Sequence, residues 1–194
     1  MMTKETILQE ALQIVVRTGV RRFQLSELAE RLGVVKSAIY HHFPKGKNQV
    51  LQALFEREEE RVLRAMEEAA QAPGSCQERL LRLVEAKLGT ISLLAQLYRA
   101  PEGVVNEVTE FCRGRRIGFS RRERELLLRL FQEGMERGEV RKLNLDLLVA
   151  GVQAALLELS ERVIREGGIN VEELTQLMVE VLFSGIGGVK WRES

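Results

Sequence analysis

The fold of this chain is decided by residues 25–44, which read LSELAERLGVVKSAIYHHFP. Two short helical patterns meet in this stretch around a glycine. Ala29 is a small residue at the point where the first helix passes the second, and Gly33 allows a sharp turn at positive φ. Ile39 faces back into the gap, and its burial fixes the angle between the helices. A short helix held in this way fits the major groove of DNA, so the spacing predicts a DNA-binding helix-turn-helix.

The opposite face of the second helix carries the side chains that we expect to bind DNA. A core helix would not place two histidines, a lysine and a tyrosine within seven residues. The N-terminal end of this helix can reach base edges, while Tyr40, the histidines and Lys47 can bind phosphate. Adjacent histidines on a helix point in different directions, so we expect no metal site. The DNA-binding residues predicted from this pattern are Lys36, Ser37, Ala38, Tyr40, His41, His42 and Lys47.

The run from Gly33 to Pro44 resembles the recognition helix of the TetR family of bacterial repressors. The following Lys45-Gly46-Lys47 looks like that family's variant with a glycine-lysine pair after Phe-Pro. The resemblance is specific over residues 5–55, and beyond them only helix number and length agree. It implies an all-helical homodimer, with a DNA-binding head of three helices and a ligand-responsive body of about six.

The chain departs from the family pattern at the starts of both helices of the motif. Val35 stands where the family usually has a Ser or Thr that caps the recognition helix, and valine cannot cap. Gln24 stands where the family usually has a Thr or Ser that often touches phosphate. Through this correspondence we add Gln24 to the expected DNA-binding residues.

The composition of the chain indicates an all-α fold of about nine helices. Its 194 residues are 45% hydrophobic and include only three prolines, and no alternating Val, Ile and Thr pattern predicts a strand. Ser120 with Glu123 has the pattern of a capping box at the start of a helix. We expect two domains, 1–47 for DNA binding and 48–194 for ligand binding and dimerisation. The helices are expected at 3–18, 25–32, 36–43, 48–71, 77–99, 102–113, 120–137, 145–166 and 171–186.

Charge and cysteine usage fit a cytoplasmic protein that meets phosphates with its N-terminal part. The net charge is +1, but residues 1–50 hold eight Lys or Arg against four Glu. Neither a signal-peptide pattern nor a run of roughly 18 apolar residues is found, so we expect no membrane partner. Cys76 and Cys112 lie in no metal-binding spacing and are interpreted as reduced thiols.

The C-terminal part of the chain is predicted to form the dimer interface. Residues 145–159 are apolar almost all round, so this helix must be covered on most sides. Together with the last helix it is expected to form a four-helix interface with a second copy. Dimerisation also suits DNA, because two heads must reach half-sites roughly 34–36 Å apart.

The resemblance implies that a small molecule binds between the middle helices. No cluster of charges and no stack of aromatic residues marks a cationic or aromatic ligand. A generally apolar effector, such as a fatty acyl compound, is therefore favoured. The candidate residues for this pocket are Tyr98, Phe111, Phe131, Met135 and Gln153.

Three functions remain open at this point. The first is a ligand-controlled repressor that binds a palindromic operator as a homodimer, and an activator of the same architecture is the second. The third is a helical protein–protein adaptor that has lost DNA binding, which Val35 and Gln24 favour. The sequence contains no nucleophile elbow, no phosphate-binding glycine loop and no His/Glu metal spacing, so neither enzymatic activity nor a cofactor is expected.

Overall fold

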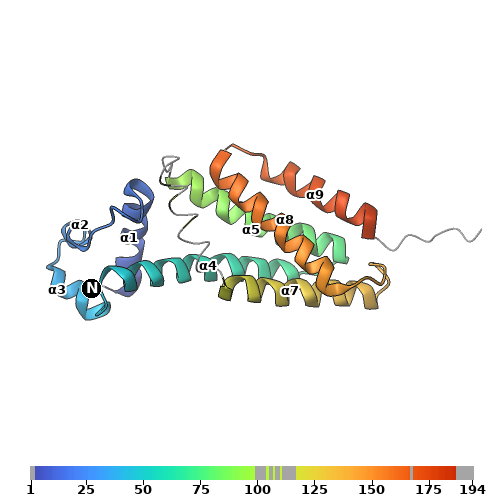
Figure 1. Cartoon of the computed structure of the whole chain (residues 1–194), viewed down its shortest axis with the longest axis horizontal. Coiled ribbons are helices and arrows are strands. Elements are labelled where there is room, and N and C mark those ends of the chain that lie inside the picture. Colours follow the sequence, from blue (N-terminus) through green and yellow to red (C-terminus); the bar gives the residue numbers. More distant parts are fainter. Residues whose placement is uncertain are drawn as a thin grey trace, which may run out of the picture. The chain divides into compact units, whose positions relative to one another are not determined.

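The computed structural model describes residues 3–98, 104, 107, 110, 117–166 and 168–186. Every regular element in these ranges is an α-helix, which confirms the all-α fold. The expected helix at 102–113 lies outside the described residues, except for helical positions 104, 107 and 110. The helices are α1 (Lys4–Thr18), α2 (Leu25–Arg31), α3 (Lys36–His42), α4 (Lys47–Gln71), α5 (Cys76–Tyr98), α7 (Ile117–Glu136), α8 (Leu145–Glu166) and α9 (Val171–Ile186) (Figure 1).

Local sequence signals set several of the helix ends. The Thr3 hydroxyl caps α1 by accepting the Thr6 N–H at 3.1 Å. The same helix ends at Gly19, whose φ of 86° is accessible to glycine and costly for other residues. The break between α4 and α5 lies at Ala72-Pro73-Gly74-Ser75, as the turn residues predict.

The predicted capping box at the start of α7 is wrong. This helix begins at Ile117, so Ser120 lies inside it and caps nothing. Phe119 packs against a hydrophobic core, and this burial favours a helix that starts a turn earlier than the local pattern indicates. The Glu123 carboxylate instead pairs with Lys87 of α5.

The chain divides into two compact units. The head unit comprises residues 1–61 and 94–116, and the body unit comprises 62–93 and 117–194. The predicted division of function at residue 47 stays a prediction. Within the described ranges, no helix is long and apolar enough to cross a membrane.

The head unit is built around one apolar cluster to which α1, α2, α3 and the start of α4 all contribute. Ile14 and Phe23 are fully buried in it, as are Leu28, Ile39 and Leu54. Ion pairs between α1 and α2 surround the cluster, with Arg31 bound to Glu10 and Arg17 bound to Glu27. The cluster therefore fixes α3 against α1 and α2, which holds the predicted recognition helix in place.

The body unit has a larger apolar core, drawn from the end of α4 and from α5, α7, α8 and α9. Gly134 of α7 lies directly against Cys76 at the start of α5. A methyl group at that position would lie 2.7 Å from the Cys76 Sγ and 2.9 Å from the Cys76 Cβ. Gly134 therefore sets the spacing of these two helices by having no side chain.

Candidate DNA-binding site and effector-binding core

The turn between α2 and α3 has the geometry that its sequence predicts. Ala29 is 4% exposed and Ile39 is fully buried, so both face the space between the helices. Gly33 adopts a φ of +66°, in the region that favours glycine. The Val34 N–H donates to the Ala29 carbonyl at 2.9 Å, which closes the turn. These contacts confirm that Ala29, Gly33 and Ile39 form the turn and fix the angle between the two helices.

The outer face of α3 is polar and open to solvent. Positions i, i+1, i+4 and i+5 of this helix share one side, and the exposed residues follow that pattern. Ala38 and His42 lie beside this side and are half-buried. The structure thus brings together most of the residues predicted to bind DNA. The exposed ones are Lys36, Ser37, Tyr40 and His41.

Neither helix of the motif has a side-chain cap. Gln24 and Val35 occupy the N-cap positions of α2 and α3 in extended conformations, and neither side chain accepts a bond from its helix. Gln24 is exposed, and its side-chain oxygen lies 3.3 Å from the Ser26 hydroxyl. The first N–H groups of both helices therefore receive no cap from these two side chains.

Tyr40 and Lys47 are held by the turn that follows α3. The Tyr40 ring lies so close to Gly46 that a methyl group there would be 3.1 Å from the Tyr40 Cε1. The Lys47 ammonium donates to the Arg21 carbonyl at 3.0 Å, so this residue also ties α4 to the loop before α2. Tyr40 keeps 47% of its surface exposed despite the contact with Gly46.

The two histidines of α3 interact with each other and hold no metal-binding geometry. Their rings meet edge to face, with centroids 5.4 Å apart. Across the described part of the chain, no three His, Cys, Asp or Glu side chains are grouped to hold a metal ion. His41 remains exposed and can face a DNA phosphate or base.

The residues predicted to line an effector pocket lie in different surroundings. Phe131 is fully buried in the body core and Met135 packs against it, both from α7. Gln153 of α8 donates to the Ser120 carbonyl at 2.9 Å and belongs to a polar cluster. The side chain of Tyr98 and all of Phe111 lie outside the described residues.

The body core contains a buried polar cluster that the sequence patterns did not predict. Lys87 of α5 binds Glu123 of α7 at 2.5 Å, and the Gln153 amide nitrogen lies 3.4 Å from the other Glu123 oxygen. The Lys87 ammonium also lies 5.4 Å from the Phe119 ring centroid, within the range of a cation–π contact. We call Lys87, Phe119, Glu123 and Gln153 the Lys87 cluster.

A sequence signal for this cluster exists. Lys87 interrupts the apolar stripe that Leu80, Val84 and Ile91 form along α5 at helical spacing. Glu123 has the same place on α7, one turn before the buried Leu127. A charge at a core position of each of two helices is a reason to look for an ion pair between them.

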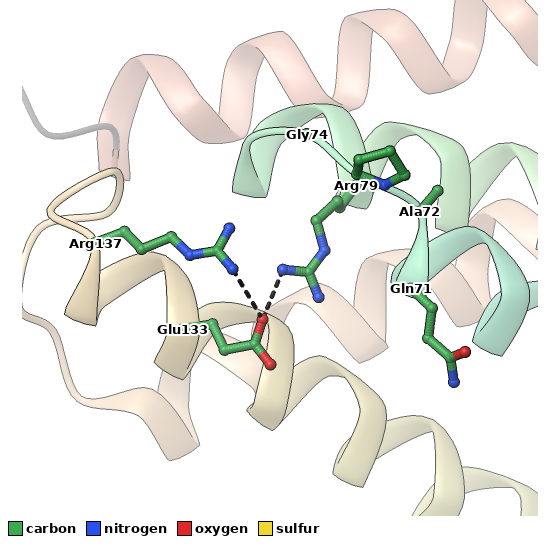
Figure 2. Close-up of a pocket in the computed structure, with 7 residues that line it drawn as sticks. Gln71, Ala72, Gly74, Arg79, Glu133 and Arg137 are labelled. Carbon is green, nitrogen blue, oxygen red and sulfur yellow. Dashed lines mark hydrogen bonds and ion pairs between the residues drawn. The ribbon is translucent and has the colours of Figure 1, made fainter.

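A surface pocket of about 340 Å³ lies in the body unit beside the turn between α4 and α5. Figure 2 shows that Arg79 and Arg137 both point at the Glu133 carboxylate, at 2.6 and 3.8 Å. The hydrogen bond from Arg79 holds the pKa of Glu133 below its usual range. None of the predicted effector-binding residues lines this pocket, and its ion pairs are best explained as links between α5 and the end of α7.

Cys76 is a free and buried thiol at the start of α5. Its sulfur lies 3.6 Å from the Leu130 carbonyl, and burial raises its pKa to about 12. Such a thiol stays protonated near neutral pH and does not act as a nucleophile. Cys112 lies outside the described residues.

The fold and the site together define a DNA-binding transcriptional regulator. The family model described as bacterial regulatory proteins, tetR family, matches residues 7–54, which include the whole helix-turn-helix. Residues 7–54 therefore carry the helix-turn-helix domain of this family.

Solved structures of bacterial transcriptional regulators have the same fold over nearly the whole chain. FadR from Bacillus subtilis, solved in complex with stearoyl-CoA, is 21% identical with a TM-score of 0.76, covering 95% of this chain and 100% of its own. A TetR/AcrR-family regulator from Thermobifida fusca is 25% identical with a TM-score of 0.68, covering 94% and 97%. PfmR from Thermus thermophilus is 22% identical with a TM-score of 0.69, covering 92% and 97%.

Proposed function

We propose that this regulator is a repressor that binds a palindromic operator as a homodimer and is released by a small apolar effector. The observation that carries the proposal is the exposed polar face of α3, which a fully buried Ile39 holds in place. A short helix fixed in this way presents Lys36 and Ser37 to base edges. Tyr40, His41 and Lys47 follow as phosphate contacts that fix the register on the duplex.

The dimer is supported by an apolar surface on the last two helices. Leu147 and Leu157 of α8 are 71% and 41% exposed, and Leu177 and Val181 of α9 are 58% and 64% exposed. Small side chains separate the two leucines of α8, and they allow another helix to approach closely. A second copy of the same surface would remove these side chains from water. The exposed small residues of α8 are Ala150, Gly151, Ala154 and Ala155.

The effector is proposed to bind in the body unit, with its apolar part in the core and its polar end at the Lys87 cluster. Among the described core residues, the polar or charged ones are few, and Lys87 and Glu123 are the charged pair. A ligand with an apolar chain and one polar group matches this distribution. The complex of the Bacillus subtilis relative with stearoyl-CoA supports an acyl compound.

The head unit offers a route by which an effector would change DNA binding. Residues 94–116 belong to the head unit, and they comprise the last residues of α5 and the stretch that precedes α7. The rest of α5 and all of α7 belong to the body unit. Within the head unit, Glu107 accepts the backbone N–H of Arg21, and Glu110 pairs with the Arg21 side chain at 3.8 Å. An effector that moves this segment would favour a different head position, with a coupling of about 1–3 kcal/mol.

DNA binding is tested by selecting genomic fragments with the purified protein and measuring gel shifts on the selected sequence. We expect a saturable preference over random DNA at physiological salt, and the absence of any preference would refute the proposal. Lys47→Ala should weaken binding to all sequences alike and lower the salt slope by about 1. Lys142→Ala, at an exposed position of the body unit, is the matched control and should change neither quantity.

The dimer is tested by sedimentation of Leu177→Arg and Val181→Arg. A charge on this surface should yield folded monomers with greatly weakened operator binding, because both half-sites are then no longer held together. Gln132→Arg places the same charge on an exposed position of α7 and should remain dimeric. A wild type that sediments as a monomer at micromolar concentration would contradict the dimer.

The effector and the direction of control need two further measurements. Stearoyl-CoA added to the protein–DNA complex should release the DNA, whereas coenzyme A without an acyl chain should not. A reporter gene behind the selected operator should be transcribed more strongly when the regulator is deleted. Weaker transcription after deletion would identify an activator of the same architecture.

A further inference from the structure

The large apolar side chains that are exposed in the described part of the chain fall into two groups. Four lie on α8 and α9 and are assigned above to the dimer surface. The other two are Tyr40 and Val35, at α3. Tyr40 packs against Gly46 and carries a hydroxyl group. Val35 is 71% exposed and has no polar atom in its side chain. Neither a contact with Gly46 nor a hydroxyl group therefore accounts for its exposure.

Val35 also stands where the backbone favours a different residue. It is the N-cap of α3, with φ −79° and ψ 150°, and its carbonyl accepts the Ala38 N–H at 3.0 Å. In this conformation a Ser, Thr, Asn or Asp side chain would bind an open N–H of the helix and stabilise the head. A valine gives up that bond and exposes its methyl groups to water. A residue that breaks a local rule without a gain in the fold is a candidate for function.

The partner follows from the place of Val35 beside Lys36 and Ser37, the first residues of the recognition helix. Residues at this end reach base edges when such a helix enters the major groove. The edges there present hydrogen-bond donors and acceptors, and the one apolar group among them is the C5-methyl of thymine. We propose that Val35 contacts a thymine methyl in each half-site, and thereby adds a preference for thymine at that position. This inference rests on the proposed DNA-binding function.

The expected size of the effect follows from the burial of one methyl group. Removing about one CH₂ equivalent from water changes Kd about fourfold, or ~0.8 kcal/mol. Two half-sites give about fifteenfold if they act independently. Val35 therefore tunes which sequence is preferred, and the phosphate contacts supply most of the affinity.

The test uses the selected operator, with thymines replaced by deoxyuridine in symmetric pairs. This replacement removes the C5-methyl and leaves every hydrogen-bonding group in place. We expect one pair whose replacement weakens the wild type about fifteenfold and leaves Val35→Ala and Val35→Ser unaffected. Val35→Ser also supplies a capping hydroxyl, so it should be at least as stable as the wild type while losing the discrimination. Lys47→Ala should bind more weakly and keep the discrimination.

Two results would overturn the inference. One is a wild type that binds its operator specifically but tolerates deoxyuridine at every thymine. The other is a discrimination that persists in both Val35 variants, which would assign the methyl contact to another residue. If selection gives no preferred sequence at all, the DNA-binding function itself fails and the inference fails with it. The first two results leave the proposed function intact, so the failures are distinguishable.

Discussion

The ammonium of Lys87 on α5 lies 2.5 Å from Glu123 Oε1 on α7, and each side chain is 5% exposed. Taking two charges out of water is costly, and their attraction offsets this only when further hydrogen bonds complete the geometry. Gln153 and the Phe119 ring provide such contacts. The pair therefore specifies how α5 and α7 align more than it adds to stability.

Breaking the Lys87–Glu123 pair at one end should destabilise the body unit strongly. Lys87→Met leaves a buried carboxylate unpaired, and we expect a loss of about 3–5 kcal/mol in the free energy of unfolding by guanidinium titration. The double variant Lys87→Met/Glu123→Leu should recover most of that loss. Arg124→Met removes the exposed pair with Asp146 and should cost at most about 1 kcal/mol. If the double variant lost as much free energy of unfolding as the two single variants lose together, this account would be contradicted.

The elements that could be predicted from sequence are those set by neighbouring residues. The turn at Gly33 and the end of α1 at Gly19 follow from backbone conformations that glycine favours, and both are confirmed. The Lys87–Glu123 pair depends on how two helices pack, which no local pattern encodes. Ser120 shows the opposite case, because a valid capping pattern was overridden by the packing of Phe119. The DNA contacts stay predictions, since exposure shows only which side chains are available.

Gly134→Ala should destabilise the body unit, because the new methyl would lie 2.7 Å from the Cys76 sulfur. Overpacking of this kind costs about 1–3 kcal/mol, measured by chemical denaturation. Adding Cys76→Ala should relieve part of the loss by removing the sulfur. Gly89→Ala is the matched control, because nothing lies within 4 Å of a methyl there. It should stabilise α5 by about 0.5–1 kcal/mol, and an equal loss in both variants would show that packing is not the cause.

Cys76 should be unreactive in the folded protein. Burial is the main cause that raises its pKa to about 12, so almost no thiolate forms near neutral pH. A Cys112→Ser variant leaves Cys76 as the single thiol. A chromogenic disulfide reagent should not label this variant when native and should label it fully in guanidinium. Rapid labelling of the native variant would place the thiol at the surface.

The Arg79–Glu133 contact should make the free energy of unfolding depend on pH. Arg79 lowers the pKa of Glu133 from 4.5, so the contact stabilises the fold above about pH 4.5 and is lost as the pH falls through the folded value. Glu133→Gln should therefore lose stability less steeply than the wild type below that pH. The effect should be modest, because the Glu133 side chain is 43% exposed and solvent screens it. Arg79→Gln should flatten the same part of the profile, and a wild-type slope in both variants would contradict the assignment.

Gly46→Ala should weaken DNA binding by displacing Tyr40. The backbone φ of +66° costs an alanine about 1–2 kcal/mol, and its methyl would lie 3.1 Å from the Tyr40 Cε1. The ring must then move from its place beside Gly46, so operator affinity in a gel shift should fall together with stability. Gly138→Ala separates the two effects, because its φ is +74° while nothing lies within 4 Å of the added methyl. That variant should lose a similar amount of stability through its positive φ, and it should bind the operator like the wild type. Equal operator affinities for the two variants would mean that the position of Tyr40 does not matter to DNA binding.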